Sequence, residues 1–250
     1  MSITATIESR SHRGLLPSTS ADSPSPGGQT ALKTADSYGL QALKALELGD
    51  LLRCVTLCES ALEVQPQHYE ALHVLAQALL MSGRPADCLT VTAKILAEHP
   101  ADAVALNNTG VALDGLNRLE EAVEYYLLSS QADPKFQDPM QNRALALDKL
   151  GQHAKAESVF RELIESFPEH ADAHYGLGNA LCNQKRTAEA IPSFRKAVEL
   201  QPNFGLTWFN LGNALLEEKQ WSEAIEAFGQ ASCLIPHHAC LLYTSDAADE

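Results

Sequence analysis

The sequence predicts an all-α solenoid built from six helix–turn–helix repeats of 34 residues each. Three observations predict this fold. Prolines recur at a constant spacing, small residues recur at two fixed places between them, and apolar residues follow the three- and four-residue spacing of helices. The prolines are Pro66, Pro100, Pro134, Pro168, Pro202 and Pro236. A fixed period of 20–50 residues is typical of stacked repeat arrays, whose usable surface is long and continuous.

The first helix of each repeat is marked by a small residue at the eighth place, which lets a second helix approach closely. Each repeat is taken to end two residues after its proline. The repeats then cover 35–68, 69–102, 103–136, 137–170, 171–204 and 205–238. The eighth residues are Ala42, Ala76, Gly110, Ala144, Gly178 and Gly212, and the eleventh are Ala45, Leu79, Leu113, Leu147, Leu181 and Leu215.

The turn and the second helix follow in the same order in every repeat. The turn carries Gly or Asn in four repeats, which suits a left-handed backbone after a helix end. These turn residues are Gly49, Gly83, Asn117 and Gly151. The second helix has a small twentieth residue (Cys54, Cys88, Ala122, Ala156, Ala190, Ala224) and a mostly aromatic twenty-fourth (Cys58, Thr92, Tyr126, Phe160, Phe194, Phe228). The proline then ends this helix, because it cannot continue one.

These residues resemble the tetratricopeptide repeat family. The sixth repeat carries the fullest match, with Trp208, Leu211, Gly212, Leu215, Ala224, Phe228, Ala231 and Pro236. The first repeat departs most, with Gln41 at the seventh place and Cys54 and Cys58 in the second helix. The resemblance implies a right-handed superhelix that serves as a protein-binding scaffold.

The two ends of the chain differ from the repeats. Residues 1–34 contain eighteen Ser, Thr, Pro or Gly residues and no apolar period, so we predict a disordered leader. Residues 239–250 resemble the translation of a transposon-end adapter from sequencing libraries, and we predict that the native sequence was lost near Ala239. The alternative is a true helix of a seventh repeat. A truncated array leaves its last repeat uncapped, which predicts self-association.

Composition limits the class of partner. The formal net charge of −14 opposes binding to other polyanions, so we expect neither nucleic acid nor membrane as a partner. Cys54, Cys58 and Cys88 take places that the repeat reserves for core side chains, which predicts buried free thiols. Unpaired thiols suit a reducing compartment, and we predict a cytoplasmic location.

The sequence offers no catalytic constellation. The segment 176–181 has the spacing of a glycine loop in part, but no strand precedes it, and Gly178 is the small residue of a first helix. The histidines stand in no metal-binding or triad frame. We therefore predict no catalytic residues, no cofactor, no metal and no enzyme activity for this chain.

The family resemblance implies that the first helices line a concave groove, with places two, five, six, nine, twelve and thirteen pointing inward. At places five, six and nine most residues are amides or aromatics. We predict that a peptide-binding groove is formed by Asn107, Asn108, Gln141, Asn142, Tyr175, Asn179, Phe209, Asn210 and Asn213. A carboxamide can bond both the N–H and the C=O of a peptide backbone, whatever side chains the peptide carries. At the other inward places Asp114, Asp138, Asp148 and Asp172 add negative charge, and Lys149 is the one cation from the second repeat on.

The predicted partner is a protein or an extended peptide, neutral or basic rather than acidic, because place five holds no Lys in any repeat and the inner face is acidic. The sixth-place residues Asn108, Asn142 and Asn210 also resemble the asparagine ladder in the superhelix of O-linked N-acetylglucosamine transferases. That resemblance implies an alternative: a substrate-recognition arm of a longer glycosyl-, sulfo- or methyltransferase whose catalytic domain is missing. A third hypothesis is a purely architectural assembly subunit.

Overall fold

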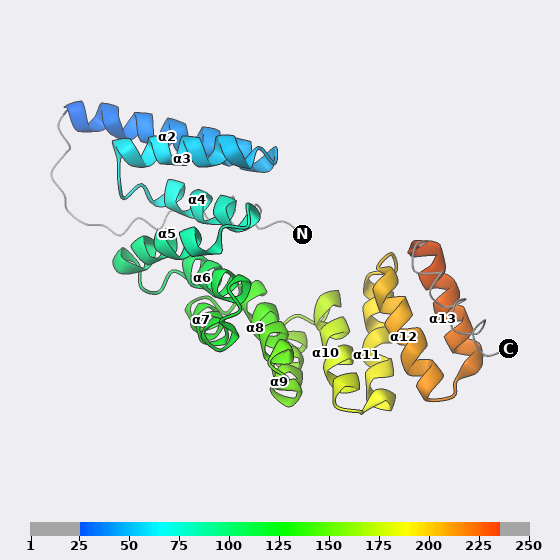
Figure 1. Cartoon of the computed structure of the whole chain (residues 1–250). Helices are drawn as coiled ribbons and strands as arrows, with labels where there is room; N and C mark the ends of the chain where they lie inside the picture. Colours follow the sequence, from blue (N-terminus) through cyan, green and yellow to red (C-terminus); the bar gives the residue numbers. More distant parts are fainter. Residues whose placement is uncertain (1–25, 236–250) are drawn as a thin grey trace. The chain divides into compact units, whose positions relative to one another are not determined.

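The computed structural model describes residues 26–235, with side chains from residue 34 on. These residues form twelve helices in six successive pairs, and they form no strand (Figure 1). The helices are α2 (Pro26–Glu47), α3 (Leu51–Val64), α4 (Tyr69–Met81), α5 (Pro85–Glu98), α6 (Ala103–Gly115), α7 (Leu119–Ala132), α8 (Asp138–Lys149), α9 (His153–Ser166), α10 (Ala171–Asn183), α11 (Thr187–Leu200), α12 (Gly205–Glu217) and α13 (Trp221–Leu234). The prediction of an all-α repeat fold is confirmed.

Helix α2 begins earlier than the sequence pattern indicated. It starts at Pro26, inside the segment 1–34 that was predicted to be a disordered leader. Proline is well tolerated at the first position of a helix, and Ala31, Leu32 and Lys33 favour helix, so the local composition supports the extra turns. The rest of that segment, 1–25, and the predicted adapter-derived tail, 239–250, lie outside the described residues. The repeat boundaries themselves stay predictions.

The chain divides into two compact modules between Ala112 and Leu113. We call the described residues up to Ala112 the N-terminal module and those from Leu113 on the C-terminal module. Each has its own apolar core. The N-terminal core includes Ala42, Cys54, Leu72, Leu79 and Ile95, and the C-terminal core includes Leu147, Phe160, Leu181, Phe194 and Leu215. None of the helices between residues 26 and 235 has the length and apolar character needed to cross a bilayer.

Small residues lie where the two helices of a repeat meet, as the sequence pattern predicts. The twentieth residue is at most 1% exposed in every repeat. At the eighth place, a Cβ on Gly178 would lie 2.5 Å from the ring of Phe194, and one on Gly212 would lie 2.7 Å from the ring of Phe228. The aromatic at the twenty-fourth place therefore fills the space that the missing side chain leaves.

The turns between paired helices adopt the left-handed backbone expected of them. Gly49, Gly83, Asn117 and Gly151 have φ between 58° and 73°. Lys185 and Lys219 occupy the same place in the last two repeats, with φ of 63° and 59°. A side chain with a Cβ is disfavoured in this region, so the turn geometry is imposed by the packing of the two helices rather than by the lysines themselves.

Asp102 ties together two helix starts in the N-terminal module. Its Oδ1 accepts a hydrogen bond of 2.8 Å from the Ala105 N–H at the start of α6. Its Oδ2 accepts one from the Tyr69 hydroxyl of α4 and lies 3.3 Å from His73 Nε2. Burial alone would raise the pKa of this carboxyl, but the contacts with His73, Tyr69 and the Ala105 N–H outweigh burial and hold the pKa below its usual range.

The Asp102 carboxylate makes the stability of the N-terminal module depend on pH. Because its folded-state pKa lies below the unfolded value of about 3.9, its stabilisation is complete above that value and is lost as the pH falls through the folded pKa. Asp102→Asn keeps an oxygen for the Ala105 N–H but removes the charge. We expect a loss of about 1–3 kcal/mol at pH 7 that shrinks below pH 4, measured by urea denaturation across this range.

The matched control is Asp87→Asn, which removes a carboxylate from an exposed ion pair with Arg84. Such pairs contribute about 0–1 kcal/mol, so this variant should differ little from the parent protein at any pH. A difference between Asp102→Asn and the parent that stays constant from pH 7 down to pH 3 would contradict the role given to Asp102.

Candidate peptide-binding groove

Polar side chains on α8, α10 and α12 form hydrogen bonds from one repeat to the next in the C-terminal module. Asn210 Nδ2 donates to Asn179 Oδ1 at 2.9 Å and to the Tyr175 hydroxyl at 3.2 Å. Asn183 Nδ2 donates to both carboxylate oxygens of Asp148 at 3.2 Å. The bonded partners lie 31–35 residues apart, close to one repeat of 34, so neighbouring places of successive first helices face one another.

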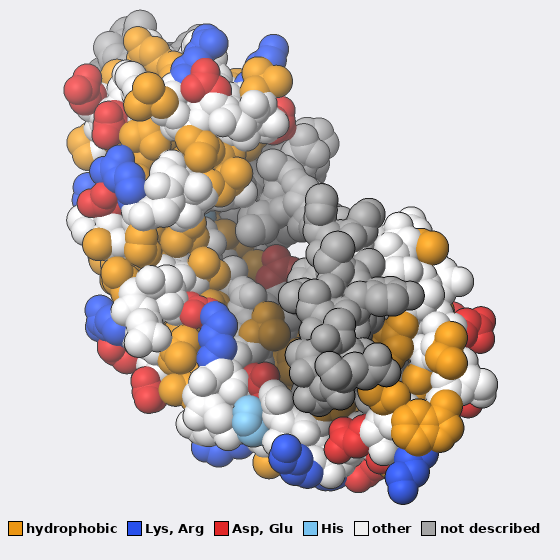
Figure 2. All heavy atoms as spheres, turned by 45° about the vertical axis from the view of Figure 1, so that its right-hand side comes forward, with side chains coloured by type: hydrophobic (Ala, Val, Ile, Leu, Met, Phe, Trp, Pro, Cys, Tyr) orange, Lys and Arg blue, Asp and Glu red, His pale blue; other side chains and the backbone are white. Residues whose placement is uncertain are grey.

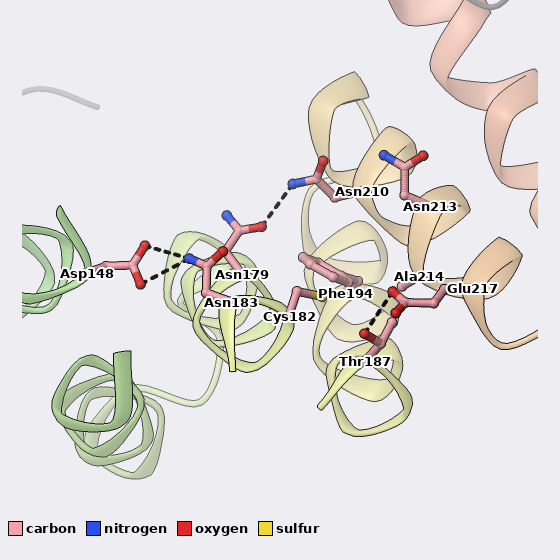
Figure 3. A pocket seen from close by; sticks show the side chains of 10 residues that line it. All are labelled: Asp148, Asn179, Cys182, Asn183, Thr187, Phe194, Asn210, Asn213, Ala214 and Glu217. Atoms are coloured by element: carbon pink, nitrogen blue, oxygen red, sulfur yellow. Dashed lines mark hydrogen bonds between the residues drawn. The ribbon is translucent and has the colours of Figure 1, made fainter. Parts of the chain in front are cut away.

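A cavity of about 450 Å³ opens beside these hydrogen bonds (Figure 3). Its walls carry carboxamides, two carboxylates and one hydroxyl, and apolar groups complete its lining. The lining residues are Asp148, Asn179, Cys182, Asn183, Thr187, Phe194, Asn210, Asn213, Ala214 and Glu217. In Figure 3 the amides of Asn179 and Asn210 lie on one side of the Phe194 ring, and Thr187 and Glu217 lie on another.

The electrostatic character of the cavity is negative. Asp148 and Glu217 are its charged lining residues, and neither forms an ion pair with a Lys or Arg among the described residues. Asp148 Oδ1 lies 2.6 Å from His153 Nδ1, and the Thr187 hydroxyl donates to Glu217 Oε2 at 2.9 Å. Burial, and secondly the charge of Glu217, raise the pKa of the Cys182 thiol that lines the cavity.

The structure brings some of the predicted groove residues together and separates others. Asn179, Asn210 and Asn213 line the cavity, and Tyr175 accepts a hydrogen bond from Asn210. Phe209 instead packs against Phe228, with ring centroids 5.8 Å apart.

The other predicted groove residues do not line this cavity. Gln141 and Asn142 are half-buried on α8. Asn107 and Asn108 belong to the N-terminal module and are only 2% and 4% exposed, so their side chains are not presented to solvent. The nine-residue groove as a whole therefore stays a prediction, and the cavity is its best-defined part.

Several lining residues were not among the predicted site residues. Asn183 and Glu217 occupy the thirteenth place of their repeats. Cys182 lies at the end of α10, and Thr187 lies at the start of α11. The signal that could have found the first two is positional, since the thirteenth place was already assigned to the inner face. Reading that place in the last three repeats, as was done for the amides, yields Lys149, Asn183 and Glu217.

The face drawn in Figure 2 carries charges of both signs. Figure 2 shows Lys and Arg side chains scattered singly among acidic and apolar ones on the face that it presents. Among the described residues, no group of three or more His, Cys, Asp or Glu side chains is placed to hold a metal ion. Cys54, Cys58 and Cys88 are buried free thiols, as predicted, and burial raises the pKa of Cys88 to about 12.

Family models match most of the repeat region. Four models, each described as tetratricopeptide repeat, match residues 45–107, 103–136, 142–204 and 193–226. No curated protein matches the sequence.

Solved structures of repeat proteins are similar to this one. PilF of Pseudomonas aeruginosa superposes with a TM-score of 0.73 at 20% identity, covering 90% of this chain and 100% of its own. A fragment of MamA from Desulfovibrio magneticus RS-1 gives 0.59 at 22% identity, covering 72% and 96%. YrrB, described as having an unusual peptide-binding site, gives 0.60 at 20% identity, covering 76% and 97%. At these identities the likeness concerns the fold alone.

Proposed function

The chain belongs to the tetratricopeptide repeat family, and from that premise we propose that its C-terminal module binds an extended segment of a partner protein through the amide side chains of α10 and α12. The fold of this family is typically a non-catalytic scaffold for protein interactions. Binding by such a scaffold relies on side chains spaced along successive helices, because no single deep pocket encloses the ligand.

The observation that carries the proposal is the meeting of three predicted amides, Asn179, Asn210 and Asn213, at one cavity. The hydrogen bond from Asn210 to Asn179 orients both carboxamides. Asn210 Oδ1, an acceptor, and Asn179 Nδ2, a donor, then have no bond to another described residue. Each residue of an extended peptide carries one backbone N–H and one backbone C=O, so it needs one acceptor and one donor from the groove in which it lies.

The charges of the cavity favour a neutral or basic segment. An acidic segment would bring its carboxylates towards Asp148 and Glu217, and like charges repel. The peptide-binding site described for YrrB, a similar fold, adds support for a peptide ligand. A cytoplasmic location, self-association through the last repeat and the transferase alternative stay predictions.

We expect the double variant Asn179→Ala, Asn210→Ala to bind peptide about tenfold more weakly, because two hydrogen bonds of roughly 0.5–1.5 kcal/mol each are lost. Random 12-residue peptides displayed on phage are selected against the full chain. The affinity of a captured peptide is then measured by fluorescence anisotropy.

The control is Asn203→Ala, which removes an exposed amide in the turn between α11 and α12, outside the cavity. Its affinity should equal that of the parent protein. Equal binding by the double variant and the parent would show that the amides are not the contact surface, and the absence of any captured peptide would reject peptide binding itself.

A further inference from the structure

We propose that the cavity receives an arginine side chain of the bound segment, and that this arginine is the specificity-determining contact of the groove. The inference rests on the proposed function and names the chemistry of its ligand. It follows from the composition of the cavity walls, the apolar groups in its lining and the lack of a cation in it.

The walls offer acceptors on several sides and no competing cation. Asp148 and Glu217 bring two carboxylates, and Asn179, Asn183, Asn210 and Asn213 bring carboxamide oxygens. A guanidinium group has five N–H donors in a planar fork and no acceptor, so it can engage a carboxylate and carboxamides on different walls at the same time. A lysine ammonium has three donors at a single point and would leave more of these acceptors unmatched.

Glu217 is the carboxylate most available to such a ligand. Asp148 already accepts two hydrogen bonds from Asn183 and lies against His153. Glu217 accepts one bond, from Thr187, to its Oε2. No other bond to Glu217 is present among the described residues, so its Oε1 is open to a donor from a ligand.

The apolar part of the lining suits the stem of the same side chain. Phe194, Cys182 and Ala214 form the apolar part of the lining, and in Figure 3 the Phe194 ring lies between the amides and Glu217. An arginine stem of three methylene groups can cover such a surface while its head reaches polar walls. A volume of about 450 Å³ accommodates the whole side chain.

The test compares selections of the displayed 12-residue library against three full-length proteins: the parent, Glu217→Gln and Glu226→Gln. Glu217→Gln keeps an oxygen for the Thr187 hydroxyl and removes only the charge. Glu226 is an exposed carboxylate of α13 outside the cavity, which makes its variant the matched control. Both variants lower the overall negative charge equally.

We expect the parent and Glu226→Gln to enrich arginine at one place of the aligned peptides by about fivefold over glutamine, and Glu217→Gln to lose that enrichment. A captured peptide with this arginine should also slow alkylation of Cys182, which lines the cavity, and leave the exposed Cys233 unaffected.

Each other outcome has a definite meaning. Captured peptides with no arginine preference would overturn the inference and leave the proposed function intact. Basic residues enriched at every place, and equally with Glu217→Gln, would show a general attraction to the acidic chain and would also overturn it. Lysine enriched as strongly as arginine would reject the arginine assignment. No captured peptide at all would reject the proposed function itself.

Discussion

Replacing Phe194 by alanine is expected to destabilise helices α10 and α11 by about 3–5 kcal/mol. The ring is 1% exposed and belongs to the C-terminal core. It fills the space beside Gly178 and packs near Tyr175, with ring centroids 6.1 Å apart. Neither neighbour can expand to fill the vacated volume, because one has no side chain and the other is hydrogen-bonded to Asn210.

The measurement is hydrogen exchange of backbone amides in residues 171–200, because repeat arrays can open locally and a single unfolding transition need not report on one repeat. Protection should fall by a factor of about 100 or more. Phe228→Ala is the matched control, since Phe228 holds the same place in the next repeat but is only partly buried. For Phe228→Ala, exchange is measured in the helices of its own repeat, α12 and α13. A loss of protection there that equals or exceeds the loss caused by Phe194→Ala in α10 and α11 would contradict the burial argument.

Gly176→Ala should also destabilise the C-terminal module, by about 1–3 kcal/mol, although alanine favours helix more than glycine does. A Cβ at this position would lie 2.2 Å from Cζ of Phe160. That ring is 1% exposed and belongs to the same core, so it has no free space into which to move. The overpacking therefore outweighs the gain of about 1 kcal/mol in helix propensity.

Gly229→Ala tests the same substitution where nothing opposes it. Gly229 lies in α13, and a Cβ there would meet no atom within 4 Å, so this variant should gain about 0.5–1 kcal/mol. Combining Gly176→Ala with Phe160→Leu should recover part of the loss, because the smaller side chain leaves room for the methyl group. Urea denaturation monitored by circular dichroism measures all four proteins. A stabilising Gly176→Ala would show that the ring moves freely.

The sequence pattern predicted the fold because the same physical requirement is repeated six times. Each repeat needs a small residue where its helices meet and a left-handed residue at its turn, and these recur at equal spacing. Lys185 and Lys219 illustrate what residue type alone misses, since lysine is no turn signal, yet each lies 34 residues after a predicted turn residue or its counterpart. The early start of α2 was missed because Gly27 and Gly28 resemble a linker in composition.

The candidate site was predictable only in part, because burial depends on neighbours that a pattern does not contain. Places five and six were interpreted as pointing inward in every repeat. Asn107 and Asn108 are nevertheless buried, whereas Asn210 reaches the cavity. Gly176 holds the sixth place between Asn142 and Asn210, and this break in the asparagine series has a packing cause, since Phe160 occupies the position that a side chain would need. Such a contact joins two repeats and cannot be inferred from either one alone.

The confinement of the cavity to residues 148–217 bears on how the protein could be lengthened. A duplicated 34-residue segment spliced ahead of residue 137 would leave every lining contact in the same order along the chain. The same segment spliced between residues 170 and 171 would separate Asp148 from Asn183 and dismantle one wall. Gene duplication could therefore extend this array at its amino-terminal side while all the residues that line the cavity are inherited together.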